Sequence, residues 1–289
     1  MKIRKKLELK FNGSSIYTLN KIGKNFLINK NYGNTTDNSS EEFLLINEKL
    51  EIIARTNIHN GHISIYQVFA CEDGNRFLVY SCDPYLLLYG DFLKGDLFTV
   101  DIENIKDKSF SHIYLWLENS ILILIDEEIY EFNIFDKKLK KIEMGEIKKS
   151  YADFYIFQKE CQKHMPIKYA DFINKNYIYL ENYLNFDGNY NAVYVDHKNK
   201  KMKKIEDIRN KYYDYHDIIF HKGYFILVAE EILTIIKDKK TYTYPMRDKS
   251  YIFAKASGID NNEKLSFIVL ERYQGCEEKS DRLVRYELS

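Results

Sequence analysis

The stretch that decides the fold is EEIYEFNIFDKKLKKI, residues 127–142. Apolar residues dominate its first half, a polar turn follows at Asp136, and a second run mixes apolar residues with lysines. Two such runs around a short polar turn predict a β-hairpin. Similar stretches recur as EEFLLINEKLEII at 41–53, YNAVYVDHKNKKMKKI at 190–205 and EEILTIIKDKKTYTY at 230–244. The chain is therefore built from copies of one unit.

The spacing of these polar turns gives the size of the unit. They lie at Asn47, Lys94-Gly95, Asp136, Lys198, Asp238 and about Ser280. The successive gaps are about 47, 42, 62, 40 and 42 residues. A period of roughly 40–50 residues is typical of the four-stranded blades of a β-propeller. The long gap contains a segment, 150–168, that fits no copy of the repeat.

We therefore expect an all-β chain that forms a single β-propeller, with six four-stranded blades. The blades would span about 12–56, 62–103, 111–145, 169–207, 214–246 and 250–289. The strand at 2–11 has no partner before it, and we expect it to complete the last blade beside 282–288, because unpaired sheet edges invite aggregation. Five or seven blades, a β-helix and a β-sandwich remain alternatives. Only KMKKIEDIRNKY, 201–212, indicates a short turn of helix.

Two sequence features give the units a family resemblance. Gly61-His62 precedes one inner strand, and His112 and His216 stand at the matching place in two other units. The third strands end at Ile46-Asn47, Phe135-Asp136, Val195-Asp196 and Lys237-Asp238. WD40 blades carry Gly-His before the innermost strand and Trp-Asp at the end of the third, so the units resemble degenerate WD40-type blades. The resemblance covers most of the chain and implies propeller geometry, although no Trp-Asp pair is present.

The histidines before the inner strands are the first candidate site. Connections between blades end where the central channel opens, so His62, His112 and His216, with Tyr215 beside them, would surround that opening. Imidazole rings there could bind a ligand or a metal ion. The WD40 resemblance instead implies hydrogen bonds that hold strands together. Three histidines in six units suit a symmetric metal centre poorly, and we assign no metal, cofactor or catalytic residue.

The insertion 150–168 is the main candidate for binding a partner protein. A departure from a repeat forms a loop on one face, and such loops often carry binding residues. Its mixture of aromatic and basic side chains suits protein recognition. The residues are Phe154, Tyr155, Phe157, Lys159, Lys163, His164 and Met165. A structural flap is the alternative, and the lone Cys161/His164 pair does not predict zinc. The polar run 29–42 predicts a mobile loop.

The charged runs recur with the repeat. Glu-Glu pairs stand at 41–42, 127–128 and 230–231. A catalytic pair is needed only once, so we expect solvated acidic turns before the third strands rather than catalytic carboxylates. The lysine runs 137–141 and 198–204 fall on outer hairpins, where charge protects sheet edges.

The overall composition argues against several classes of function. The 289 residues contain 43 Lys and Arg against 43 Asp and Glu, so no net charge draws the chain to nucleic acid or an anionic membrane. No apolar run has the length of a membrane span, and no signal-peptide pattern follows the basic N-terminal stretch. The four scattered cysteines indicate reduced thiols. We expect a cytoplasmic protein.

The leading hypothesis is a non-enzymatic protein-binding β-propeller that acts as a monomer. An adaptor, an inhibitor or an immunity-type protein that neutralises a partner protein would fit. Nucleotide-binding loops, esterase elbows and metalloprotease motifs are all missing from the sequence. One alternative is a propeller hydrolase or lyase that acts on a sugar or lactone through His, Asp or Glu at the channel mouth. A second is nucleic-acid binding through a lysine-rich rim.

Overall fold

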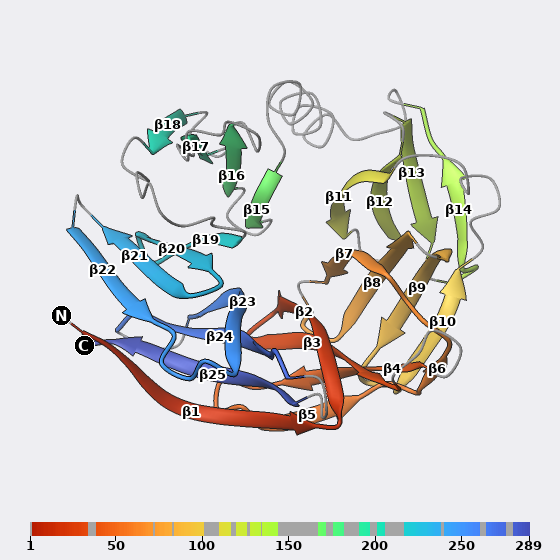
Figure 1. Ribbon diagram of the computed structural model, residues 1–289. Coiled ribbons are helices and arrows are strands. Elements are labelled where there is room, and N and C mark those ends of the chain that lie inside the picture. Colours follow the sequence, from red (N-terminus) through yellow and green to blue (C-terminus); the bar gives the residue numbers. More distant parts are fainter. Residues whose placement is uncertain are drawn as a thin grey trace.

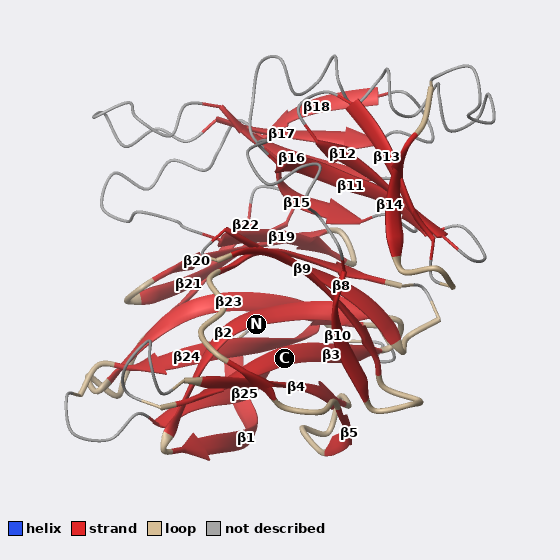
Figure 2. Cartoon of the chain, turned by 90° about the vertical axis from the view of Figure 1, so that its right-hand side faces the viewer, coloured by secondary structure: helices blue, strands red, loops and turns tan. Residues whose placement is uncertain are grey.

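The structure is a computed structural model, and the part of the chain that it describes contains β-strands and no helix. Figure 2 shows this part from the side, with strands throughout. The described residues are 2–33, 39–71, 73–82, 84–100, 110–116, 120–125, 128–133, 135–143, 167–171, 176–181, 191–196, 201–205, 217–237, 240–260, 264–275 and 280–289. The all-β class expected from the sequence is confirmed over these residues.

Four antiparallel sheets of four strands follow one another along the chain. In chain order they are the second to fifth sheets, because the first unit belongs to a larger sheet. The second sheet contains β7 (Ile65–Ala70), β8 (Arg76–Cys82), β9 (Tyr85–Asp91) and β10 (Asp96–Val100). The third sheet contains β11 (Phe110–Trp116), β12 (Ser120–Ile125), β13 (Glu128–Asn133) and β14 (Lys138–Lys141). The fourth contains β15 (Ile167–Asp171), β16 (Asn176–Glu181), β17 (Asn191–Asp196) and β18 (Lys201–Ile205). The fifth contains β19 (Asp217–His221), β20 (Tyr224–Ala229), β21 (Ile232–Lys237) and β22 (Lys240–Pro245).

The remaining strands form a nine-stranded sheet with two halves. The first half contains β2 (Ser14–Ile22), β3 (Asn25–Tyr32), β4 (Ser40–Ile46), β5 (Ile52–Arg55) and β6 (His59–Asn60), which pairs with β4. The last half contains β23 (Tyr251–Ile259), β24 (Ser266–Tyr273), β25 (Ser280–Leu288) and β1 (Ile3–Asn12). A single parallel pair, Ser14 with Ser280, joins the halves. Gly13 alone separates β1 from β2 and has a positive φ of 69°, which glycine adopts without strain.

Strand pairing bears out two expectations and corrects one. The hairpin in EEIYEFNIFDKKLKKI is present as β13–β14, with Tyr130 opposite Lys141 and Asn133 opposite Lys138. β1 pairs antiparallel with β25, so the first and last strands of the chain lie side by side. The helical turn suggested for 201–212 is wrong over its first five residues, because Lys201–Ile205 is the edge strand β18.

The sheets are arranged radially around a common centre. In Figure 1 the first strands, β2, β7, β11, β15, β19 and β23, lie toward the middle, and the fourth strands lie outside. β2 contacts both β7 and β23, and β19 contacts both β15 and β23. The outer hairpins therefore form the rim of the molecule.

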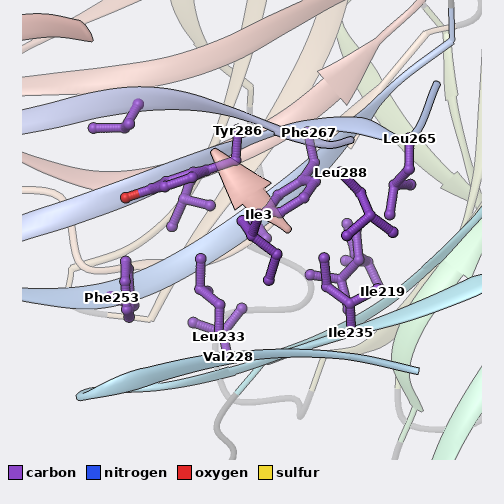
Figure 3. Close-up of a cluster of buried hydrophobic side chains, with 14 of the residues drawn as sticks. Ile3, Ile219, Val228, Leu233, Ile235, Phe253, Leu265, Phe267, Tyr286 and Leu288 are labelled. Carbon is purple, nitrogen blue, oxygen red and sulfur yellow. The ribbon is translucent and has the colours of Figure 1, made fainter. Parts of the chain in front are cut away.

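The core consists of apolar layers between neighbouring sheets. On β24, Phe267 and Val269 face the fifth sheet, whereas Ile268 and Leu270 face the first half-sheet. Strands buried on both faces require apolar residues at successive positions, which explains runs such as SFIVL at 266–270. Figure 3 shows the layer between β19–β22 and the last half-sheet, where Tyr286, Phe267 and Phe253 pack against residues that include Ile235.

Candidate functional site

The structure describes two of the eleven residues expected to bind a partner. His62 lies just before β7 and is half-buried, and His112 lies within β11. The other nine lie outside the described residues and stay predictions. They are Phe154, Tyr155, Phe157, Lys159, Lys163, His164, Met165, Tyr215 and His216.

His62 interacts electrostatically with Glu41. The carboxylate of Glu41, at the start of β4, has 0% exposure. The Nδ2 groups of Asn29 and Asn31 donate to Glu41 at 2.8 and 2.5 Å, and the backbone N–H of Ile63 donates to it as well. Burial raises the pKa of Glu41, while these donors and the neighbouring His62 oppose the rise. The carboxylate is therefore buried but well supplied with hydrogen-bond donors.

The same network continues to the innermost strand. The side-chain oxygen of Asn29 accepts from the backbone N–H groups of Tyr17 and Thr18, at 3.0 and 2.9 Å. These N–H groups lie where the β2–β3 pairing shifts register, between Ile16 and Leu19. Tyr17 and Thr18 have no register partner on β3. Glu41 and Asn29 thus hold a β-bulge in place, which is a structural role.

The expectation of solvated acidic turns is wrong for the pair at 41–42. Glu42 is also buried, and its carboxylate accepts from the Tyr32 hydroxyl at 2.5 Å and from Arg55 at 3.2 Å. Burial, together with the hydrogen bond to Glu42, raises the pKa of Tyr32 to about 12. The expectation holds for Glu230 and Glu231, which are exposed in the turn before β21.

A pH titration will test the buried state of Glu41. Because its folded pKa is raised, the folded chain holds more protons than the unfolded chain between the two pKa values, so Glu41 lowers stability as the pH rises through this window. Relative to Glu41→Gln, the wild type should gain stability as the pH falls from neutral, through the raised folded pKa of Glu41, toward the unfolded carboxyl pKa of about 4.3. Urea unfolding of both proteins at each pH measures this difference. A difference that stays constant, or that grows with pH, would contradict the assignment.

A second set of residues lies at the outer hairpins, where three turns each contain the same type of hydrogen bond. In each, a side-chain oxygen at the end of the third strand accepts from the backbone N–H two residues later. Asn47 accepts from Lys49, Asp91 from Leu93, and Asn133 from Phe135, each at 2.9 Å. The residue that follows by two therefore donates the same hydrogen bond in the three turns, although the first turn has its positive φ at Leu50, three residues after Asn47, and the other two have it four residues on, at Gly95 and Lys137.

The residue types at this position differ sharply. The first half-sheet places Lys49 in solvent there, as a polar turn requires. The second and third sheets place Leu93 and Phe135 there, with 79% and 76% of these residues exposed. Two bulky apolar side chains thus project into water two residues after the third strand, where the first turn carries lysine.

The β9–β10 turn is held firmly in this orientation. Phe92 is buried against the Phe77 ring, with ring centroids 5.0 Å apart, and its backbone N–H donates to the carbonyl oxygen of Asn75 at 3.0 Å. Since Phe92 points into the core, the next residue, Leu93, points outward. The carbonyl oxygen of Gly95 accepts from the N–H of Asn57 at 2.8 Å, which joins this turn to the preceding sheet.

Neighbouring outer segments carry two more exposed apolar side chains. Ile53 on β5 and Ile58 before β6 are 49% and 57% exposed, and Ile58 directly follows the Asn57 that bonds to the β9–β10 turn. On the other side, Lys137 of the β13–β14 turn lies over the Phe98 ring of β10, with Nζ 4.1 Å from its centroid. We call Ile53, Ile58, Leu93 and Phe135 the apolar rim. They are four of the five exposed large hydrophobic residues among the described part of the chain.

The apolar rim was not predicted from the sequence, although the same turns marked the repeat. Lys94-Gly95 and Asp136 were interpreted only as polar turns between strands. A signal was available: an Asp or Asn ends the third strand, and a bulky apolar residue stands two positions later, inside the turn.

Among the described residues, no three His, Cys, Asp or Glu side chains gather as a metal site would require. No helix long and apolar enough to cross a membrane occurs over the same residues.

Comparison with known proteins identifies the fold. No protein-family model matches the chain, and no curated protein does. A DUF4221-family member from Bacteroides vulgatus is similar at a TM-score of 0.53 and 10% identity, over 100% of this chain and 99% of that one. A variant of Kluyveromyces lactis Hsv2, with loop 6CD replaced by a Gly-Ser linker, gives 0.51 and 10%, over 90% and 93%. YCF48 bound to D1 peptide gives 0.47 and 9%, over 98% and 95%.

At these identities the likeness concerns the fold alone. The similar structures are propeller-like, and the radial sheets of this chain agree with them. The chain therefore has a β-propeller fold, as the period of its repeats predicts.

Proposed function

We propose that this chain is a non-enzymatic protein-binding β-propeller that holds a partner protein against its apolar rim. The observation that carries the proposal concerns the residue two positions after the Asn or Asp that ends the third strand. This residue is Lys49 in the first turn, Leu93 in the second and Phe135 in the third. The hydrogen bond that orders each turn uses the backbone N–H of this residue and leaves its side chain free of any role in that bond. Leu93 and Phe135 are therefore best explained by a surface that covers them.

The energetic argument concerns the group rather than any single residue. Isolated apolar residues on a surface are ordinary, but several on adjoining segments mark an interaction site. Covering apolar surface contributes about 25 cal/mol per Å² removed from water. The turns are also braced by their side-chain hydrogen bonds and by Phe92, so little conformational entropy is lost when a partner binds.

We further propose six blades as the architecture that presents this rim. The two halves of the nine-stranded sheet would each count as one blade, with β1 as the outer strand of the last. The pairing of β1 with β25 supports this count. The boundaries would follow the repeat units, and the WD40-type resemblance stays an interpretation of those units.

The test compares capture of a partner by two matched variants. The wild type, Leu93→Lys/Phe135→Lys, and the control Leu7→Lys would be used as bait in a lysate of the native host. Lysine is the residue that the first turn already carries, and Leu7 is an exposed apolar residue of β1 outside the rim. A protein captured by wild type and control would be purified and its Kd measured. We expect the double variant to bind at least about tenfold more weakly.

Equal affinity of the double variant and the wild type would contradict the apolar rim as the docking surface. A third bait lacking 150–168 separates the rim from the insertion expected from the sequence. Loss of binding in that bait alone would assign docking to the insertion. Circular dichroism of every bait establishes that it is folded.

The proposed setting is the cytoplasm, with the chain acting as a monomer. An adaptor, an inhibitor and an immunity-type protein each use a rigid disc that covers part of a partner, and all three fit this proposal. They differ in the fate of the partner: its activity would be lost on binding for an inhibitor or immunity protein and kept for an adaptor.

A further inference from the structure

We propose that the β13–β14 hairpin binds an acidic segment of the partner protein, with a bulky apolar side chain of that segment against Phe135. This inference rests on the proposed function and names the chemistry of the partner. It concerns the stretch 133–141, where an exposed aromatic ring and a group of lysines occur together.

The second half of the hairpin, 135–141, carries a local excess of positive charge, although Glu128 and Glu131 on β13 leave the whole hairpin with a net charge of +1. Four lysines and one aspartate lie between Phe135 and Lys141. Lys141 is engaged by Glu128 at 2.6 Å, and Lys137 lies over the Phe98 ring. Lys138 and Lys140 are exposed on β14, the edge strand of its sheet, and Lys140 stands opposite Glu131 of β13 in the strand register. The one aspartate, Asp136, accepts the backbone N–H of Lys138 at 3.1 Å.

Phe135 is fixed next to these charges. Its own N–H donates to Asn133, while Lys137, with a positive φ of 61°, donates its N–H to the carbonyl oxygen of Asn133 at 3.0 Å. The ring therefore stands at the turn and the exposed lysines begin three residues later. An acidic segment with one large apolar residue would match both features, because the apolar contact provides affinity and the charges provide orientation.

A partner protein fits these observations better than a membrane or nucleic acid. The formal net charge of the chain is zero, so no overall field draws it to an anionic polymer or bilayer. Leu93, the neighbouring apolar tip, is flanked by Lys94 but also by Asp91 and Asp96. A surface of mixed charge around two apolar tips favours a folded or extended polypeptide over a uniformly anionic polymer or bilayer.

The test uses the purified full chain with defined probes. The first probe is a short fluorescent peptide in which glutamate and leucine alternate. Two others replace leucine by serine, or glutamate by lysine. Anisotropy should show binding of the first peptide and weaker binding of both others. Lys138→Glu/Lys140→Glu should weaken the first by about tenfold, since it replaces two attractive contacts with the peptide glutamates by two repulsive ones. Phe135→Ser should weaken it by a similar factor.

Matched controls and competing ligands complete the experiment. Lys24→Glu/Lys240→Glu also reverses two exposed lysines, but away from this hairpin, and should leave binding unchanged. Binding should fall as salt is added. The proposal is overturned if the hairpin variants bind the glutamate–leucine peptide as the wild type does, or if only anionic vesicles or duplex DNA bind to the hairpin. Rim-dependent capture of a partner without any charge dependence would overturn this inference and leave the proposed function standing.

Discussion

Replacing Glu271 by alanine is expected to lower the free energy of unfolding by about 3 kcal/mol or more. Glu271 on β24 is fully buried, with one carboxylate oxygen 2.7 Å from Nε of Arg282 and the other accepting from the Tyr286 hydroxyl at 2.5 Å. Its removal leaves the guanidinium of Arg282 buried without its closest counter-ion. Asp248 and Glu8 are more distant, at 3.5 and 3.6 Å, and replace the lost pairing only in part.

Urea unfolding followed by circular dichroism measures this loss. Glu230→Ala removes an exposed glutamate and should change stability by less than about 0.5 kcal/mol. A second variant, Glu271→Leu/Arg282→Met, removes both charges and should recover much of the stability, because a buried ion pair replaced by apolar residues of similar volume is often neutral. A loss below about 1 kcal/mol for Glu271→Ala would mean that Arg282 finds full compensation elsewhere.

The position of this ion pair explains why its loss would matter for the whole fold. Arg282 lies on β25, its guanidinium is 3.6 Å from the centroid of the Tyr251 ring at the start of β23, and Glu8 on β1 lies close to it. One side chain therefore connects the strands that bring the two ends of the chain together. Tyr286, the other partner of Glu271, packs with Phe267 and Phe253 in the layer of Figure 3.

The hairpins of this fold could be predicted because their signals are local. In 127–142, the apolar pattern and the turn residues determine both strands, and the observed register of β13 and β14 depends on nothing distant. The pairing of β1 with β25 was predictable for another reason, since a lone first strand needs a partner. The helical turn at 201–212 failed as a prediction because a short lysine-rich edge strand and a helical turn share the same composition.

The polar network around Glu41 could not be predicted in this way. The Glu-Glu pairs look alike in three units, yet Glu41 is buried and Glu230 is exposed. Burial depends on Asn29, which lies one strand earlier, and on Ile63, which belongs to the next unit. No pattern within 41–53 contains this information.

The apolar rim shows a similar limit. Whether Leu93 or Phe92 points into the core depends on the Asp91 hydrogen bond and on the ring of Phe77 across the sheet. The sequence supplies both residues but not the direction of either. The insertion at 150–168, like Tyr215 and His216, stays a prediction for partner binding.

Replacing Gly90 by alanine is expected to lower the free energy of unfolding by about 2–3 kcal/mol. Gly90 on β9 pairs directly with Phe77 on β8, and a Cβ atom at Gly90 would lie 2.1 Å from Cζ of the Phe77 ring. That ring is fully buried between Phe43 and Phe92, with centroids 5.1 and 5.0 Å away, so it cannot move without disturbing the layer. Urea unfolding of wild type and variant measures the loss.

Two further variants identify the cause. Gly223→Ala has nothing within 4 Å of the new Cβ but a φ of +77°, so its cost, about 1 kcal/mol, reports backbone strain alone. Gly90→Ala/Phe77→Leu relieves the clash, and the two changes together should cost less than the sum of the single changes. Simple additivity would show that Phe77 does not restrict Gly90. Because Phe92 contacts the same ring and orients Leu93, Gly90→Ala should also weaken the proposed binding of a partner at the apolar rim, which a stability effect confined to the core would not do.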